Sequence, residues 1–128
     1  MPANQSGFTY HLDAVTATAA EVNAVCDKNV QALIGAGAIT ADGTVNRVTL
    51  AGGAYAATLA VPGAGAVGSF LCIEYRGGDT DAVTLALTNV IGGTAATSAL
   101  FNADRETLFL YGLADKWLVL KEVGVTLS

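Results

Sequence analysis

The sequence predicts a mainly β protein, a small antiparallel β-sandwich or jelly-roll-like β-tulip, preceded by an N-terminal arm and one short α-helix. Two observations predict this class. After Gly37, short runs rich in Val, Leu, Thr and aromatic residues alternate with Gly, Asp and Asn turns. Before Gly37, one stretch has helical spacing, and the 128 residues suffice for a single core. We therefore expect an arm over residues 1–17, a helix over 18–35 and a β-domain over 38–128.

The arm is polar except where Phe8, Tyr10 and Leu12 alternate with polar residues, which is typical of a strand. The segment is too short to make a stable hairpin by itself. We expect it to pair with the sheet edge of a neighbouring protein, with these three side chains as anchors. The alternatives are that the arm folds back onto its own domain or, like many termini, is disordered.

The helix prediction depends on a capping box, in which Thr18 and Glu21 each accept a backbone N–H at the helix start. Apolar residues then recur at helical spacing, at Val22, Val25, Cys26, Val30 and Leu33. The pattern predicts a helix from about Ala19 to Ile34, ended by Gly35 and Gly37.

The strands are expected where β-branched and aromatic residues cluster between turn residues. The expected ranges are about Val45–Leu50, Tyr55–Val61, Ser69–Tyr75, Ala82–Val90, Thr97–Phe101, Thr107–Tyr111 and Trp117–Val123. Two of these runs, Phe70–Ile73 and Leu108–Tyr111, are apolar on both faces. Such strands need a second cover, which the helix or a neighbouring subunit would provide.

Between two of these strands, Gly63, Gly65 and Gly68 match the G-x-G-x-x-G pattern of dinucleotide-binding loops. That pattern binds a pyrophosphate only when a helix follows and presents its free N–H groups. Here a β-like run, Ser69–Tyr75, follows instead. We interpret the match as a coincidence in a loop between two antiparallel strands, so no nucleotide cofactor is expected.

Charge and composition point to assembly. Charged residues make up 13% of the chain and hydrophobic residues 52%, against roughly 25% charged in an average soluble domain. Copies of the chain, or a larger particle, are therefore expected to cover part of its surface. The net charge of −5 disfavours nucleic-acid binding. Two long stretches carry no charge, Val48–Ile73 and Ala82–Ala103, but turn residues divide both into short segments, so neither is expected to be a membrane helix. The N-terminus lacks the pattern of a secretion signal, so a soluble protein made in the cytoplasm is expected.

Few residues could carry chemistry. Cys26 and Cys72 are interpreted as free, buried thiols, and His11 is the sole histidine, so no metal cluster is expected. The Gly77–Asp81 loop could offer oxygens to calcium, but a hairpin whose Asp side chains cap their own backbone is the preferred interpretation. Trp117 is interpreted as a core residue rather than a sugar-stacking platform.

The Asp104–Glu106 triplet is interpreted as a solvated turn between two strands rather than as a seat for a polar ligand. The sequence also lacks a nucleophile motif and a recognisable acid pair. We therefore expect no catalytic, cofactor or metal site, and no enzymatic activity.

Several short segments resemble bacteriophage proteins. The run Thr16–Asn23 resembles the T-A-x-E-[LIV]-N segment that recurs in virion proteins of tailed bacteriophages. Further segments resemble the β-domain of phage head decoration, or cement, proteins, namely Val48–Leu50, Thr58–Gly63, Gly68–Tyr75, Lys116–Leu120 and Gly124–Ser128.

The resemblance implies a non-enzymatic virion protein that trimerises, sits on the capsid exterior and clamps neighbouring major capsid proteins. Two other classes stay open. A fibre or receptor-binding module would be favoured by an exposed aromatic cluster on loops. A small enzyme or carbohydrate-binding domain would be favoured by an apolar pocket with converging polar groups.

Overall fold

The computed structural model describes Thr18 and residues 29–78, 81–92 and 96–128. The strands are β1 (Asn29–Leu33), β2 (Gly37–Ile39), β3 (Val45–Leu50), β4 (Tyr55–Leu59), β5 (Phe70–Tyr75), β6 (Val83–Leu87), β7 (Val90–Ile91), β8 (Ser98–Phe101), β9 (Thr107–Gly112), β10 (Trp117–Val123) and β11 (Thr126–Leu127). A 3-10 turn, η1, covers Ala64–Ala66. In the described part of the chain, no helix has the length and apolar character needed to cross a membrane.

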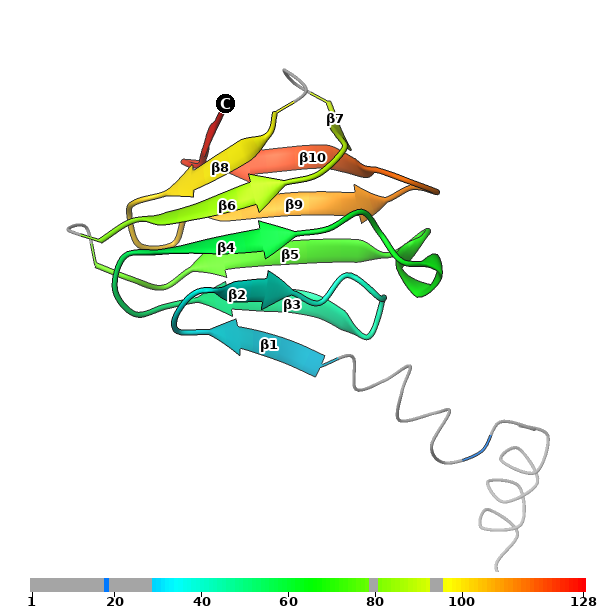
Figure 1. Ribbon diagram of the computed structural model, residues 1–128, viewed down its shortest axis with the longest axis horizontal. Helices are drawn as coiled ribbons and strands as arrows, with labels where there is room; N and C mark the ends of the chain where they lie inside the picture. Colours follow the sequence, from blue (N-terminus) through cyan, green and yellow to red (C-terminus); the bar gives the residue numbers. More distant parts are fainter. Residues whose placement is uncertain (1–17, 19–28, 79–80, 93–95) are drawn as a thin grey trace, which may run out of the picture.

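The strands form two layers, which confirms the predicted β-sandwich (Figure 1). One sheet has six strands in the order β1-β3-β5-β9-β10-β7, and the other has five in the order β11-β8-β6-β4-β2. Side chains alternate strictly along β6, where Val83, Leu85 and Leu87 are buried and Thr84 and Ala86 are exposed. The inward residues of both layers make one hydrophobic core, whose largest members are Trp117, Tyr75, Phe101, Leu50, Leu59, Leu71, Ile73, Leu85, Leu108 and Leu110.

The sheets are mixed rather than antiparallel, which corrects the expected strand pairing. β1, β3 and β5 pair in parallel in the six-stranded sheet, and β2, β4 and β6 do so in the five-stranded sheet. From β1 to β6 each connection therefore carries the chain to the opposite layer. Parallel neighbours need a crossover, and here a strand of the other sheet provides it in place of a helix. Antiparallel pairing is confined to β5-β9-β10 and β6-β8-β11.

The prediction of a helix is wrong for its C-terminal part, because residues 29–33 form strand β1. Five residues of β1 pair with β3. The Gln31 amide donates from Nε2 to the Ala38 carbonyl (3.0 Å) and accepts the Thr40 N–H at Oε1 (2.8 Å). The side chain thus satisfies backbone groups at the edge of β2, where a neighbouring strand would otherwise pair. These hydrogen bonds stabilise a strand here, although Val30 and Leu33 have the spacing of a helix. Residues 19–28, including Glu21 of the capping box, lie outside the described residues.

The predicted strand Ala82–Val90 is two strands in different sheets. β6 ends at Leu87 in the five-stranded sheet, and β7 pairs with β10 in the other sheet. Asn89 stands between them with a φ of 55°, in the left-handed region that Asn tolerates better than most residues. This left-handed residue lies at the break, which the β-rich composition of the segment does not reveal.

The G-x-G-x-x-G loop is a crossover between β4 and β5, which are not paired with each other but lie in opposite sheets. Its glycines let two turns pack backbone to backbone: the Gly63 N–H donates to the Ala41 carbonyl (2.7 Å), and a Cβ on Gly65 would collide with the carbonyl oxygen of Asp42. Gly68 has a φ of 80° and donates its N–H to Gly112 (2.8 Å). Strand β5 follows the loop directly, where a dinucleotide-binding loop would be followed by a helix.

Trp117 joins the two layers. Its side chain is 2% exposed, and its indole N–H donates to the carbonyl of Ala60 (2.8 Å), at the end of β4. Its backbone N–H donates to Asn89 (3.1 Å), which fixes the left-handed residue before β7. Trp117 is therefore a core residue, as the sequence predicts.

We predict that Gly65→Ala destabilises the fold by about 1–3 kcal/mol, because the new methyl group must displace the backbone of Asp42. Urea denaturation followed by circular dichroism measures the loss. Gly53→Ala is the matched control, since nothing lies within 4 Å of a Cβ built there. Equal stability of the two variants would contradict the proposed packing of the two turns.

Trp117→Phe is expected to lower the free energy of unfolding by about 1–3 kcal/mol, because the Ala60 carbonyl loses its buried donor. Tyr111→Phe is the control, because it removes a polar group from an aromatic residue at the surface and should change stability by less than about 0.5 kcal/mol. An unchanged urea midpoint for Trp117→Phe would show that the indole hydrogen bond adds nothing.

Candidate interaction surface

Several large apolar side chains lie on the outer face of the six-stranded sheet. Leu71 and Leu110 point into the core and are at most 2% exposed, whereas their neighbours Phe70 and Phe109 are 64% and 39% exposed. This outcome agrees with the sequence prediction that these two strands are apolar on both faces. Contiguous exposed apolar side chains of this size mark interaction sites more often than scattered ones do.

Strand register aligns the outward residues in rows across the sheet. The first row runs Phe70–Tyr111–Leu118–Ile91 across β5, β9, β10 and β7, and contains no charged residue. We call these four residues the aromatic row. The rings of Phe70 and Tyr111 lie 5.2 Å apart between centroids at an interplanar angle of 59°, a tilted pair that fixes both rings on the surface.

Polar character increases along the strands away from the aromatic row. The middle row, Arg47–Cys72–Phe109–Lys121, carries a cation near each end. The third row, Thr49–Glu74–Thr107–Val123, carries one carboxylate. The face is thus apolar at one end and charged at the other.

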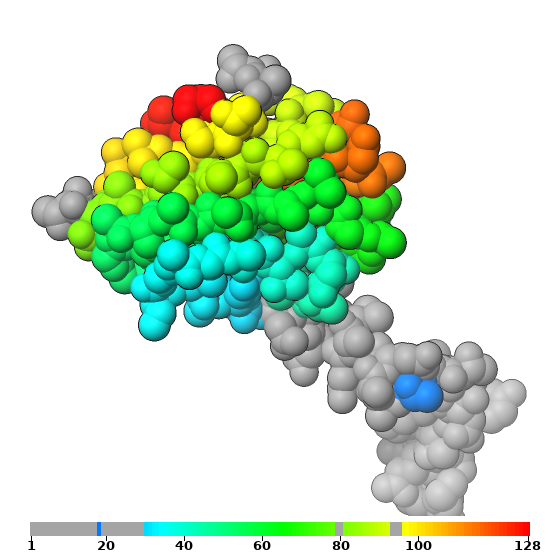
Figure 2. All heavy atoms as spheres, in the orientation of Figure 1, coloured from blue at the N-terminus to red at the C-terminus, as the bar shows by residue number. Residues whose placement is uncertain are grey.

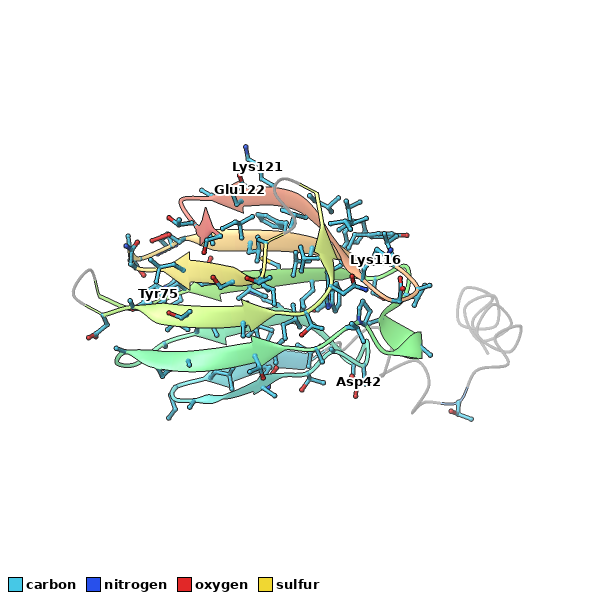
Figure 3. All side chains as sticks on the ribbon, turned by 45° about the horizontal axis from the view of Figure 1, so that its top comes forward. Asp42, Tyr75, Lys116, Lys121 and Glu122 are labelled. Atoms are coloured by element: carbon cyan, nitrogen blue, oxygen red, sulfur yellow. The ribbon has the colours of Figure 1, made fainter. Side chains whose placement is uncertain are left out.

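The single carboxylate of this face is already paired. Glu74 lies 3.9 Å from the Arg47 guanidinium and 3.3 Å from that of Arg76, and its side chain is 19% exposed. Lys121 and Glu122 project from β10 at the rim of the sandwich (Figure 3). Charges therefore border the apolar surface and do not interrupt the aromatic row.

Cys72 is a free thiol in the middle of the face and is partly exposed, not fully buried as the sequence suggests. Burial raises the pKa of this thiol, the positive charge of Arg47 lowers it, and the negative charge of Glu74 raises it. The thiol therefore stays protonated at neutral pH and is a poor nucleophile there. Cys26 lies outside the described residues.

The outer face of the five-stranded sheet carries smaller side chains. Its outward residues are uncharged and, except for Leu100, small: Ala38, Ala56, Thr58, Thr84, Ala86, Ser98, Leu100 and Thr126. The space-filling view shows this layer as an even surface (Figure 2). Its one large outward side chain, Leu100, is half-buried, so the two faces of the sandwich differ in the size of their exposed side chains.

Other sequence candidates have structural roles in the described residues. Arg105, with a φ of 73°, shapes the turn between β8 and β9, as predicted. Glu106 is not solvated, because its carboxylate is buried and accepts the Asn102 N–H (2.9 Å). The Gly77–Asp81 loop is described only in part, and no group of three or more His, Cys, Asp or Glu that could hold a metal is found among the described residues.

The predicted partner contacts Phe8, Tyr10 and Leu12 lie outside the described residues. Sequence reasoning found the two-faced strands but missed the row itself, because only strand register places Leu118 beside Tyr111 and Ile91 beside Leu118. What this arrangement offers chemically is a flat, apolar contact surface with a charged border. Neither the protein-family models nor the curated proteins searched contain a match to this chain.

In a Cys26→Ser background, Arg47→Ala is expected to raise the pKa of Cys72 further and to slow its alkylation near neutral pH, because the lost cation favoured the thiolate. The rate of iodoacetamide modification across a pH series measures the shift. Arg105→Ala, on the turn after β8, removes the same charge elsewhere and should leave the profile unchanged. A profile that moves to lower pH in Arg47→Ala would contradict this description of the face.

Proposed function

We propose that this chain is a non-enzymatic structural protein of a bacteriophage virion, a capsid decoration or cement protein that binds the outer surface of the head as an oligomer, with a trimer expected. The observation that carries the proposal is the aromatic row with its charged border, a surface suited to permanent protein contact. The low charge of the whole chain and the resemblance of its segments to phage head proteins support the same function.

In the proposed mechanism, binding stabilises the assembled capsid thermodynamically. A protein that binds the assembled capsid, and not its separated subunits, shifts the equilibrium toward the assembled state. An oligomer that contacts several major capsid proteins at once gains avidity, because each contact after the first is intramolecular. In this mechanism the segment with Phe8, Tyr10 and Leu12 reaches the neighbouring protein and adds an extended strand to it.

A fibre or receptor-binding module is the second candidate. Such a module would carry its exposed aromatic residues on loops, where shape can vary without affecting the scaffold. Phe70 and Phe109 lie instead on β5 and β9 in the middle of a sheet, which favours a fixed structural contact. For a carbohydrate-binding domain, the sequence candidate for a stacking ring is Trp117, and that side chain lies in the core.

The test is co-sedimentation with undecorated capsids of the phage that carries the gene. Full-length protein should pellet with the capsids and raise the temperature at which they break apart. We predict that Phe8→Ala/Tyr10→Ala/Leu12→Ala and a deletion of residues 2–13 reduce occupancy at least about tenfold, since each variant lacks the apolar anchors.

A matched control changes the alternate positions of the same segment, Thr9→Ala/His11→Ala/Asp13→Ala, and should retain full occupancy. If the anchor variants occupy capsids at the density of the unmodified protein, the segment is not the capsid contact. If the unmodified protein itself fails to bind the capsids, the decoration function is wrong.

A further inference from the structure

The aromatic row is a narrow strip at one end of the face. It crosses four neighbouring strands, three spacings of about 4.8 Å, so it is about 14 Å long and about 7 Å wide. This area is on the order of 100 Å², whereas a specific interface buries about 800 Å² per partner. The strip by itself is therefore too small to hold a separate globular protein, but its shape fits an extended segment.

The chain joins the β-domain beside this strip. β1, β3 and β5 run in parallel, so Asn29 at the start of β1 lies at the same end of the sheet as Phe70 at the start of β5 (Figure 1). The two strands are two spacings apart in the sheet, about 10 Å. The chain that precedes Asn29 therefore enters the sheet close to the aromatic row.

We propose that, in the unassembled protein, residues 8–12 lie along the aromatic row of their own chain, with Phe8, Tyr10 and Leu12 packed against it. This contact goes beyond the proposed function and does not rest on capsid binding. It covers the exposed apolar row until a partner is present, and a partner that uses the row or the segment displaces this contact.

The dimensions of the segment fit the row. In an extended chain Phe8 and Leu12 are about 13 Å apart, close to the length of the row, and alternate side chains point to the same side. Residues 13–28 connect the segment to β1 and reach at most about 55 Å when extended. The far end of the row, on β7, lies five strand spacings from β1, about 24 Å. The connector is therefore long enough to place the segment anywhere along the row.

The tether favours the segment of the same chain over that of another molecule. A segment on a short flexible linker acts at an effective concentration of about millimolar, which separate molecules at micromolar concentration do not reach. A contact of this small area is therefore occupied from within the chain. A neighbouring copy would need a second contact outside the aromatic row.

Charge favours the same occupant. Residues 1–27 contain no Lys or Arg, and their acidic residues are Asp13, Glu21 and Asp27. The row of the face next to the aromatic row carries Arg47 and Lys121, and Lys121 forms no ion pair with another described residue. The chain before β1 is acidic and cations outnumber the single carboxylate of the face, so the two attract each other.

The experiment measures cross-linking between the segment and the face in the full chain. In a Cys26→Ser background, His11→Cys gives the segment one thiol, and Cys72 provides the second thiol, one row away from Phe70. A short bismaleimide joins the two thiols when the segment lies on the row. Peptide mass spectrometry of the digested protein measures the initial rate of cross-linking.

We expect Phe8→Ala/Tyr10→Ala/Leu12→Ala to lower the rate of cross-linking within the chain at least about tenfold, because the apolar anchors are lost. The matched control changes alternate positions of the same segment, Thr9→Ala/Asp13→Ala, and should alter the rate less than about threefold. The comparison separates a docked segment from one that meets Cys72 only because it is tethered.

A second thiol position tests the location of the contact. In Cys72→Ser/Thr84→Cys the thiol lies on the exposed outer face of the five-stranded sheet, and the cross-linking rate should fall to that of the anchor variant. Mixing copies that carry only the segment thiol with copies that carry only Cys72 measures contact between molecules. This mixture should give less than about a tenth of the cross-linked product.

Dye binding tests the cover without added cysteines. Deletion of residues 2–13 should expose the row and raise the fluorescence of anilinonaphthalene sulfonate at least about threefold, because this dye binds exposed apolar surface. Phe70→Ser in the deleted chain should remove the increase. The fluorescence of Trp117, the sole tryptophan and a buried residue, checks in each sample that the sandwich is folded.

The proposal is overturned by equal cross-linking rates with and without the anchors, by equal rates at Cys72 and at Thr84→Cys, or by dye fluorescence that the deletion leaves unchanged. Cross-linking mainly between molecules would also overturn it and would assign the row to a neighbouring copy. A covered row in a protein that ignores capsids would keep this contact and remove the decoration function. An uncovered row in a protein that binds capsids would do the reverse.

Discussion

The parallel ladders at the centre of each sheet constrain everything else in this fold. Because β3 pairs in parallel with β5, and β4 with β6, the chain must cross between the layers after each of these strands. The crossings β2–β3 and β4–β5 meet at one end of the sandwich, where Gly65 packs against the backbone of Asp42. The glycine pattern that resembles a nucleotide-binding loop is thus a consequence of sheet topology, since two turns can approach this closely only where a side chain is missing.

The same topology determines which surface is available for assembly. β5 and β9 are central strands of the six-stranded sheet, so their inward residues are committed to the core through Leu71, Ile73, Leu108 and Leu110. Any further apolar side chain on these strands must point outward. Phe70 and Phe109 are therefore not required by the core, which is compatible with the contact surface proposed above.

Much of the fold is predictable from local pattern, and the remainder depends on pairing. Alternation identifies Val45–Leu50 as a strand with the bounds that β3 has, and it locates β5, β9 and β10 closely. Alternation cannot say which strand lies beside which, so an antiparallel sandwich and this mixed one predict the same residues as buried. The residues of β1 fit a helix by spacing, and only the backbone of β3 and the edge of β2 favour the strand. The sequence predicts which single strands are apolar on both faces, as in Leu108–Tyr111. It does not predict the aromatic row, because the row depends on the register between four strands.

Assembly through a face rather than an edge has a physical advantage for a charge-poor sandwich. An open strand edge pairs with almost any extended backbone and so invites aggregation. In this fold the Gln31 amide occupies the edge of β2, and on β10 the register shifts between Val119 and Lys121, which disturbs a second edge. A face, in contrast, is recognised through its side chains, and only a partner with complementary shape and charge covers the aromatic row. A chain with 13% charged residues has little repulsion to prevent nonspecific association, so complementary shape and charge would have to make the proposed assembly selective.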